Sequence, residues 1–307
     1  MKKVLVATEK PFAKSAVEGI EKIVTDAGYE LLLLENYTEK SQLLDAVKNV
    51  NAVIIRSDKI DKEIIDAAND LEIVVRAGAG YDNVDCEAAS AKNVVVMNTP
   101  GQNSNAVGEL AIGLMLYAAR NYFNGTSGSE LQGKTLGLYA LGNTAKCLAK
   151  AAHGLGMQVY AYAPSKDDAY LAAENVKRAA SPDELFSKCQ YVSLHMPLKP
   201  ETKESITYEL MAMMPKNATL VNTARKEVMN EDGLLKMFAL RKDFKYMSDI
   251  QPAKKEAIDN VCENRMYCTP KKMGAQTSEA NINAGLAAAS QIVNFFKSGD
   301  KTFQVNH

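Results

Sequence analysis

The sequence contains no tryptophan and no apolar segment long enough to cross a membrane. Its longest apolar stretch, LAIGLMLYAA at residues 110–119, is shorter than the ~20 residues that a transmembrane helix needs. The N-terminal MKKVLVATEKP has only a short apolar run before Thr8, which is typical of a first β-strand and not of a secretory signal. We therefore expect a cytoplasmic protein with no membrane partner.

Cysteine and histidine are too scattered for a metal site. The five cysteines form no C-x-x-C pair, and the three histidines do not stand at zinc-ligand spacings from them, so we expect no bound metal. An odd number of dispersed cysteines fits a reducing compartment. With 36 basic and 37 acidic side chains, the chain has no basic excess, and we expect no nucleic-acid partner.

What the sequence does contain is an alternation of apolar strands and amphipathic helices, repeated twice. The predicted strands are 3–8, 29–35, 51–57, 71–78 and 93–99 in the first repeat, and 134–140, 157–163, 191–196, 218–223, 244–250 and 265–270 in the second. Strands so continuously apolar are typical of parallel sheets that are buried on both faces. The length of 307 residues allows two domains, so we predict an α/β protein with two Rossmann-like, doubly wound parallel-sheet domains.

Two long helices are predicted in addition, at residues 103–123 and 278–299. The second helix ends on Gly299 as its C-cap. It is rich in alanine and apolar on more than one side, so we expect it to pack back on the first domain.

A strand-like segment, TLGLYALGNTAK, continues into the start of a helix. A dinucleotide-binding turn places glycines in the pattern G-x-G-x-x-G, and here the three positions hold Ala140, Gly142 and Ala145. Gly142 keeps the position where a side chain would meet the pyrophosphate, whereas Ala140 must either keep a negative φ or accept strain. Asn143 and Thr144 open the helix, whose free N–H groups favour an anion.

The end of the next strand, VYAYAPSKDD, bears on the choice of cofactor. An acidic residue there would bind the adenosine ribose, but the position holds Ala163. Ser165 and Lys166 stand where a 2′-phosphate would lie, which leaves NADP open beside NAD. On these two features alone, an ordinary strand–helix turn and a cofactor site are equally well supported.

Six segments occur together in the order of a known family: RAGAGYDNVDCEAA, VVMNTPGQNSNAVGEL, GKTLGLYALGNTAK, VSLHMPLKPETK, LVNTARKEVMNEDGL and TPKKMGAQTSEANINAG. Over nearly the whole chain they resemble the D-2-hydroxyacid dehydrogenases, and within them the phosphoglycerate dehydrogenase branch. Because the chain stops at FQVNH, the resemblance is to a short form without a regulatory C-terminal domain. It implies a substrate-binding domain at 1–100, completed by the C-terminal helix at 285–307, a dinucleotide-binding Rossmann domain at 101–284, and a cleft between them.

The resemblance also implies roles for individual residues. The family's catalytic arginine follows N-T-A, which here gives Arg225, a planar cation suited to clamp a carboxylate and polarise the neighbouring carbonyl. The loop of Ala77, Gly78 and Ala79 resembles the backbone loop that binds the substrate carboxylate. The residues that match the lining of the dinucleotide are Gly142, Asn143, Thr144, His195, Pro197, Thr223 and Asp249, and Asp249 would accept a hydrogen bond from the nicotinamide carboxamide.

Two arginines predict the chemistry of the substrate. Arg56 and Arg76 end two successive apolar strands, so we expect both at the edge of the sheet where ligands bind. In the phosphoglycerate branch, arginines at such positions meet the substrate phosphate. The expected partner is therefore a small phosphorylated hydroxy acid.

The family's Glu–His pair is absent. The histidine segment T-P-H-x-G reads TPKKMG, and the glutamate spacing selects Lys254. Counting back from Gly274 aligns Lys272 with the histidine, whereas counting forward from Pro270 aligns Lys271; we favour Lys272. A lysine with the ordinary pKa of about 10.4 is a poor base at neutral pH, so this substitution would need burial and neighbouring cations to lower the pKa.

Two interpretations follow from this substitution. In the first, the chain is an NAD-dependent dehydrogenase of D-3-phosphoglycerate, with lysine as the base; a glyoxylate or hydroxypyruvate reductase that uses NADPH is the alternative within the same class. In the second, the site is inactive and the protein only binds a dinucleotide. Relatives dimerise through the helix at 103–123, so the resemblance also implies a homodimer.

Overall fold

The computed structural model describes all residues, 1–307, and the chain divides into two compact units. Unit 1 combines Met1–Asn103 with Ala275–His307, and unit 2 is Ser104–Gly274. The divisions at 103 and 274 differ from the sequence-based boundaries at 100 and 284. At the second division the difference arises because Ala284, before the expected boundary, is already buried in the core of unit 1.

Unit 1 contains a five-stranded parallel sheet with the strand order β2-β1-β3-β4-β5. Its strands are β1 (Lys3–Thr8), β2 (Glu30–Glu35), β3 (Ala52–Ile55), β4 (Ile73–Arg76) and β5 (Val95–Asn98). Its helices are α1 (Lys14–Asp26), α2 (Lys40–Ala46), α3 (Lys62–Ala67), α4 (Cys86–Ala91) and α12 (Ser278–Ser298). Asp61, Asp85 and Thr277 each accept a backbone N–H from the first turn of a helix, which fixes where α3, α4 and α12 begin.

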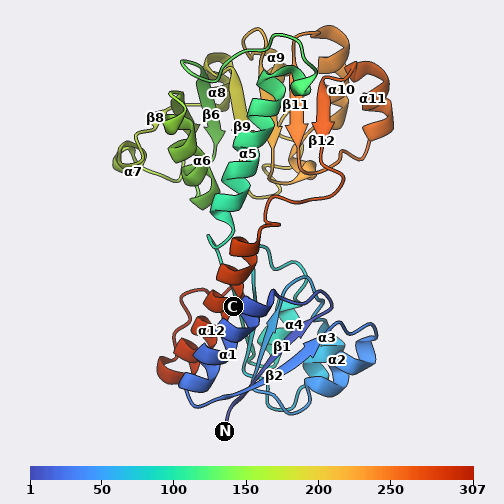
Figure 1. Ribbon diagram of the computed structural model, residues 1–307, viewed down its shortest axis with the longest axis vertical. Coiled ribbons are helices and arrows are strands. Elements are labelled where there is room, and N and C mark those ends of the chain that lie inside the picture. Colours follow the sequence, from blue (N-terminus) through green and yellow to red (C-terminus); the bar gives the residue numbers. More distant parts are fainter. The chain divides into compact units, whose positions relative to one another are not determined.

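Successive side chains of these strands point to opposite faces of the sheet and form two cores. Val53 and Ile55 pack with residues of α2, α3 and α4, whereas Ala52 and Ile54 pack with residues of α1 and α12. In Figure 1 the red helix α12 lies beside the blue helix α1. Residues from both ends of the sequence therefore cover the same face of this sheet, as expected for the last helix.

The two edges of this sheet differ. Strand β5 is covered by the last residues of the chain: Val305 N–H donates to Val96 O at 2.9 Å, and Asn306 Oδ1 accepts a hydrogen bond from Val96 N–H at 2.8 Å. Strand β2 forms the other edge, and Leu33 is exposed there. The expectation of strands buried on both faces is therefore wrong for β2, in which every side chain is at least partly exposed.

Unit 2 contains a seven-stranded parallel sheet with the strand order β12-β11-β10-β9-β6-β7-β8. Its strands are β6 (Thr135–Tyr139), β7 (Gln158–Tyr162), β8 (Lys177–Arg178), β9 (Tyr191–Leu194), β10 (Thr219–Asn222), β11 (Lys245–Ser248) and β12 (Met266–Cys268). Its α-helices are α5 (Ser104–Ala119), α6 (Asn143–Gly154), α7 (Asp168–Ala173), α8 (Pro182–Lys188), α9 (Tyr208–Ala212), α10 (Glu231–Leu240) and α11 (Lys255–Cys262). The sheet again has a core on each face.

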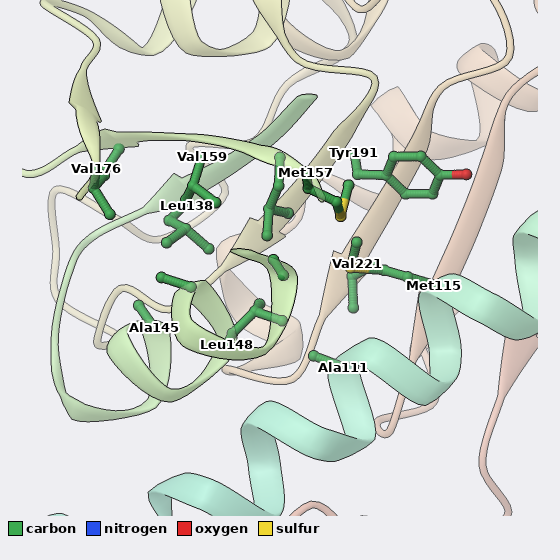
Figure 2. Close-up of a cluster of buried hydrophobic side chains, with 14 of the residues drawn as sticks. Ala111, Met115, Leu138, Ala145, Leu148, Met157, Val159, Val176, Tyr191 and Val221 are labelled. Carbon is green, nitrogen blue, oxygen red and sulfur yellow. The ribbon is translucent and has the colours of Figure 1, made fainter. Parts of the chain in front are cut away.

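One of these cores joins the first strands of unit 2 to α5 and α6. Figure 2 shows Leu138 of β6 and Val159 of β7 above Ala145 and Leu148 of α6. Helices α5 and α6 approach each other closely at Gly108, where an added Cβ would lie 3.0 Å from the Leu148 backbone nitrogen. This packing fixes the position of the turn between β6 and α6.

The prediction of an α/β protein with two parallel sheets is confirmed. Two local features were not predicted: the two-residue strand β8, and the end of the helix expected at 103–123. This helix stops at Ala119, and Asn121, Tyr122 and Phe123 then form a left-handed turn with φ values of 48°, 58° and 54°. None of the helices combines the length and the hydrophobicity that a membrane span requires.

Candidate active site

The turn between β6 and α6 leaves the N-terminus of α6 open. Gly142 is the N-cap residue, and no side chain accepts a hydrogen bond from the first turn of the helix. The backbone N–H groups of Asn143 and Thr144 therefore remain available to an anion, and the helix dipole favours a negative charge there.

Gly142 and Ala140 behave differently from what their residue types suggest. Gly142 has a φ of −94°, which any residue can adopt, and an added Cβ would meet no atom of the chain within 4 Å. Neither conformation nor packing within the chain thus explains this glycine, whereas a closely bound phosphate would. For Ala140 the sequence left open a negative φ or a strained backbone. Its φ is 76°, so the backbone is strained at this residue.

Three neighbouring strands of unit 2 end in polar residues. His195 follows β9, Thr223 follows β10 and Asp249 follows β11. The atoms His195 Nε2, Thr223 Oγ1 and Asp249 Oδ1 are buried and have no hydrogen-bond partner in the chain. Buried polar atoms are nearly always hydrogen-bonded in folded proteins, so three orphans at one edge of a sheet indicate a ligand.

Burial shifts the pKa of two of these groups. It lowers the pKa of His195 to about 4, so the imidazole is neutral at pH 7. It also raises the pKa of Asp249, although the backbone N–H of Gly274 and the charge of Lys272 act in the opposite direction. Asp249 Oδ2 accepts a hydrogen bond from Gly274 N–H at 2.8 Å, which leaves Oδ1 for a donor outside the chain.

Two residues near this edge qualify the sequence-based assignment. Ser193, in the middle of β9, also has a buried and unpartnered hydroxyl, and a lone serine in the apolar run YVSL was the only signal for it. Pro197 is exposed, and its carbonyl accepts a hydrogen bond from Thr202 Oγ1 at 2.7 Å. The open helix N-terminus and the orphaned atoms together fit a bound dinucleotide.

Arg225 and Lys272 lie side by side in unit 2. Arg225 Nη1 and Lys272 Nζ each donate a hydrogen bond of 3.0 Å to the carbonyl oxygen of Ala224. Buried Asn222 orients this turn, because its amide donates to Arg225 O and accepts from Ala224 N–H, both at 3.0 Å. Of the two candidate lysines, the structure thus brings Lys272 next to the expected catalytic arginine.

The surroundings of Lys272 differ from those expected. Lys272 is exposed, so the buried environment that was expected to lower its pKa is not found. Its charge acts on Asp249, a carboxylate that the sequence-based interpretation did not place near it. Lys254, at the glutamate spacing, pairs with Asp232 on the surface of unit 2.

In unit 1, Arg56 is held by the chain itself. Its Nη1 donates to the carbonyls of Lys10 and Pro11 at 3.2 Å, its Nη2 donates to Asn281 Oδ1, and its guanidinium lies 5.2 Å from the centre of the Phe12 ring. Burial lowers the pKa of Arg56. The Nε–H and one N–H of Nη2 remain available. An anion bound by Arg56 would therefore interact with a guanidinium that also donates hydrogen bonds to Lys10, Pro11 and Asn281.

The loop expected to bind the carboxylate uses two of its N–H groups within the chain. The N–H of Ala77 already donates to Ile55 O at 2.8 Å, and the N–H of Gly78 donates to Arg76 O at 2.9 Å. The guanidinium of Arg76 fills the space over Gly78, since an added Cβ there would lie 1.5 Å from Arg76 Nη1. Of the three expected residues, only Ala79 therefore keeps a free N–H.

The ribose position has charged residues of both signs nearby, since Arg178 pairs with Asp168. Ala163 is buried directly after β7, and Lys166 lies with its ammonium 4.5 Å from the centre of the Tyr170 ring. Arg178 donates to the carbonyl of Lys166 at 2.7 Å. The side chain of Asp167 is the N-cap of α7 and accepts a hydrogen bond from Tyr170 N–H. It therefore does not take the place of the acidic residue that would bind the ribose.

Comparison with known proteins identifies the family to which the chain belongs. The model of the D-isomer specific 2-hydroxyacid dehydrogenase, NAD binding domain, matches residues 114–270, which lie within unit 2. A hydroxypyruvate reductase of Thermotoga maritima is 34% identical over 86% of this chain and 90% of its own length. A D-3-phosphoglycerate dehydrogenase of Methanocaldococcus jannaschii is 35% identical over 82% of this chain and 51% of its own length. The chain thus spans about half the length of the curated phosphoglycerate dehydrogenases that it matches.

A solved structure is similar over the full length. The NAD⁺-bound 3-phosphoglycerate dehydrogenase of Entamoeba histolytica has a TM-score of 0.88 and 46% sequence identity, with 100% of this chain and 99% of that chain covered. The expected enzyme class and the expected cofactor NAD are confirmed at the level of the family. The chain belongs to the D-isomer-specific 2-hydroxyacid dehydrogenases, and unit 2 is their NAD-binding domain.

Proposed function

We propose that this chain oxidises the 2-hydroxyl group of D-3-phosphoglycerate with NAD, and that Lys272 takes the place of the family's catalytic histidine. The observation that carries the proposal is the shared carbonyl of Ala224, which holds Lys272 Nζ and Arg225 Nη1 next to each other. An ammonium group beside a guanidinium provides a proton acceptor, once deprotonated, next to a cation that binds the substrate carboxylate.

Each group has a defined task in this reaction. Arg225 binds the carboxylate and stabilises the carbonyl oxygen that forms at C2. Neutral Lys272 accepts the hydroxyl proton at Nζ. The open turn at Gly142, Asn143 and Thr144 would hold the pyrophosphate, and Asp249 Oδ1 would hold the nicotinamide carboxamide. Bound NAD supplies the acceptor for the hydride from C2.

The substrate phosphate is assigned to unit 1. Arg56 and Arg76 stand at the carboxyl ends of neighbouring strands, and Arg76 Nε donates to Arg56 O at 2.9 Å. The name of the Entamoeba histolytica relative supports the same substrate. We expect Arg56→Ala to weaken the preference for 3-phosphoglycerate over glycerate; an unchanged preference contradicts the phosphate assignment.

The test of the function is direct. Purified protein is mixed with NAD and 3-phosphoglycerate at alkaline pH, and the absorbance of the reduced cofactor is followed. We expect turnover that exceeds turnover with glycerate. If neither NAD nor NADP is reduced across a panel of 2-hydroxy acids, the chain is a dinucleotide-binding protein without this activity.

A second candidate function is the reduction of hydroxypyruvate or glyoxylate with NADPH. It is favoured by the Thermotoga maritima relative, named a hydroxypyruvate reductase, and by Ala163 with Lys166 at the ribose position. Hydroxypyruvate with NADPH reacting faster than 3-phosphoglycerate with NAD would decide for this function. Replacing Ala163 by Asp should improve NAD binding; an unchanged affinity contradicts the assigned ribose position.

We also propose that the chain forms a homodimer through α5 and the turn that follows it. Phe123 is 69% exposed and Leu116 is 36% exposed, which leaves apolar surface on this segment. Size-exclusion chromatography with light scattering measures the mass. We expect twice the chain mass for the unaltered protein and a shift towards the single chain for Phe123→Glu.

A further inference from the structure

Two backbone donors of the loop at 77–80 make no hydrogen bond within the chain. Ala77 and Gly78 use their N–H groups for bonds to Ile55 O and Arg76 O, but the N–H groups of Ala79 and Gly80 have no partner. Ala79 is exposed and Gly80 is partly exposed, so a ligand can reach both donors. Two successive free N–H groups in a loop form a small anion-binding concavity.

The direction of these donors is set from the opposite side of each peptide. The carbonyl of Gly78 accepts a hydrogen bond from Thr99 N–H at 3.0 Å, and the carbonyl of Ala79 accepts one from Asn98 Nδ2 at 2.6 Å. In a trans peptide the C=O and the following N–H point in opposite directions, and the chain has no cis peptide. Holding these carbonyls against the end of β5 thus aims the Ala79 and Gly80 N–H groups away from β5.

A cation lies at the same place. Arg76 and Asn98 are paired in the register of β4 and β5, at the carboxyl ends of both strands. The Arg76 guanidinium lies over Gly78, one residue before the first free donor. Asn98 is buried, and its amide donates to the loop rather than to solvent. A substrate with two anionic groups therefore finds two oriented N–H donors for one group and a guanidinium for the other at the same edge of the sheet.

We propose that Asn98 is a positioning residue, which orients the N–H groups of Ala79 and Gly80 to bind the carboxylate of the substrate acid, while Arg76 at the same edge serves the phosphate. Asn98 acts through the Ala79 carbonyl and does not touch the substrate. This inference rests on one part of the proposed function, namely that unit 1 binds a 2-hydroxy acid or a 2-oxo acid.

The test compares two variants of Asn98 with a matched control. Asn98→Ala removes the amide donor, and Asn98→Asp keeps the shape but presents an acceptor to the Ala79 carbonyl. Gln291→Leu is the control, because Gln291 Nε2 donates to the main-chain carbonyl of Asn98 at 3.0 Å and does not contact the loop. Each protein is assayed with 3-phosphoglycerate, glycerate and hydroxypyruvate, and the Kd of NADH is measured by fluorescence.

We expect Asn98→Ala to raise KM about tenfold for all three acids alike, because a misaligned loop loses its bond to the group that they share. Asn98→Asp raises KM further, while the Kd of NADH and the KM values of Gln291→Leu stay unchanged. An unchanged KM in both Asn98 variants overturns the proposal, as does a rise in the Kd of NADH equal to the rise in KM.

The outcome is separable from the substrate assignment. Calorimetric titration of the NADH-loaded proteins with each acid measures the same loss without turnover. If the unaltered protein uses hydroxypyruvate and not 3-phosphoglycerate, the phosphate assignment fails while the effect of Asn98 is still read on hydroxypyruvate. An unaltered protein that binds none of the acids overturns both.

Discussion

The two parallel sheets end in opposite kinds of chemistry. At the carboxyl ends of β9, β10 and β11 in unit 2, His195, Thr223 and Asp249 carry buried polar atoms without partners. At the carboxyl ends of β3 and β4 in unit 1, Arg56 and Arg76 are tied into the chain by hydrogen bonds. Buried oxygens without a partner also end β1 and β2 of unit 1, at Thr8 and Glu35, so the difference between the two edges lies in the pair of arginines, to which we assign an anion. Under the proposed function, the same sheet topology therefore serves a dinucleotide in one unit and an acid in the other.

Two glycines, one in each unit, also differ in how the surrounding chain constrains them. Gly142 in unit 2 faces open space, so the chain itself does not require it. Gly78 in unit 1 is constrained by the chain itself, because it has a φ of 156° and the Arg76 guanidinium lies where a Cβ would be. The predictions below test this contrast, from the largest expected effect to the smallest.

The largest effect is expected from Arg225. Arg225→Ala should lower kcat/KM by about 10³-fold for every acid, with or without phosphate, because a charge-assisted pair to the carboxylate and the developing carbonyl oxygen is lost. Steady-state kinetics measure it, and Lys226→Ala serves as the control on an exposed neighbour. A loss below tenfold would leave Arg225 as a structural residue of its turn.

The next effect concerns the choice of base. Lys272→Met should lower kcat by about 10²-fold and remove the limb of the pH profile that rises towards alkaline pH, because a lysine accepts a proton only in its neutral form. Lys271→Met is the matched control and should keep the profile. The assignment would fail if the two variants exchanged behaviour, or if the alkaline limb survived in both.

A smaller effect is expected at the open glycine. Gly142→Ala should weaken NAD binding about tenfold without changing Tm, because the added methyl group meets only the ligand. Gly78→Ala should lower Tm and leave NAD binding unchanged, because alanine disfavours the φ of 156° and its methyl group displaces the Arg76 guanidinium. Calorimetry and NADH fluorescence measure both quantities. A fall in Tm for Gly142→Ala would show that the chain itself uses this glycine.

The smallest effect is expected at Ala140. Ala140→Gly should stabilise unit 2 by about 1 kcal/mol, because glycine adopts a φ of 76° without strain. Ala145→Gly is the matched control in the helix that follows, and it should destabilise by a similar amount. Urea unfolding measures both; a destabilised Ala140→Gly protein would indicate that the alanine methyl group contributes more by packing than it costs in strain.

Local sequence patterns predicted the strands well and the hydrogen bonds around them poorly. Continuous apolar runs and helix caps depend on neighbours in sequence, so β6, α6 and the turn at Gly142 were expected at their places. The engagement of Arg56 was not expected, because its partner Asn281 lies 225 residues away in sequence. The use of the Ala77 and Gly78 N–H groups was likewise hidden, since a glycine-rich loop does not reveal which donors the strands have already taken. The exposure of Lys272 also depends on the fold rather than on the motif TPKKMG.

The assembly of unit 1 from two separate stretches of chain has a consequence for biosynthesis. Unit 2 is continuous, so it can fold on the ribosome as soon as residue 274 has left the exit tunnel. Helix α12, which packs on Ile20 and its neighbours, leaves the ribosome only after unit 2. Until then an apolar face of the earlier half is uncovered, and chains truncated after residue 274 should be preferred targets of chaperones.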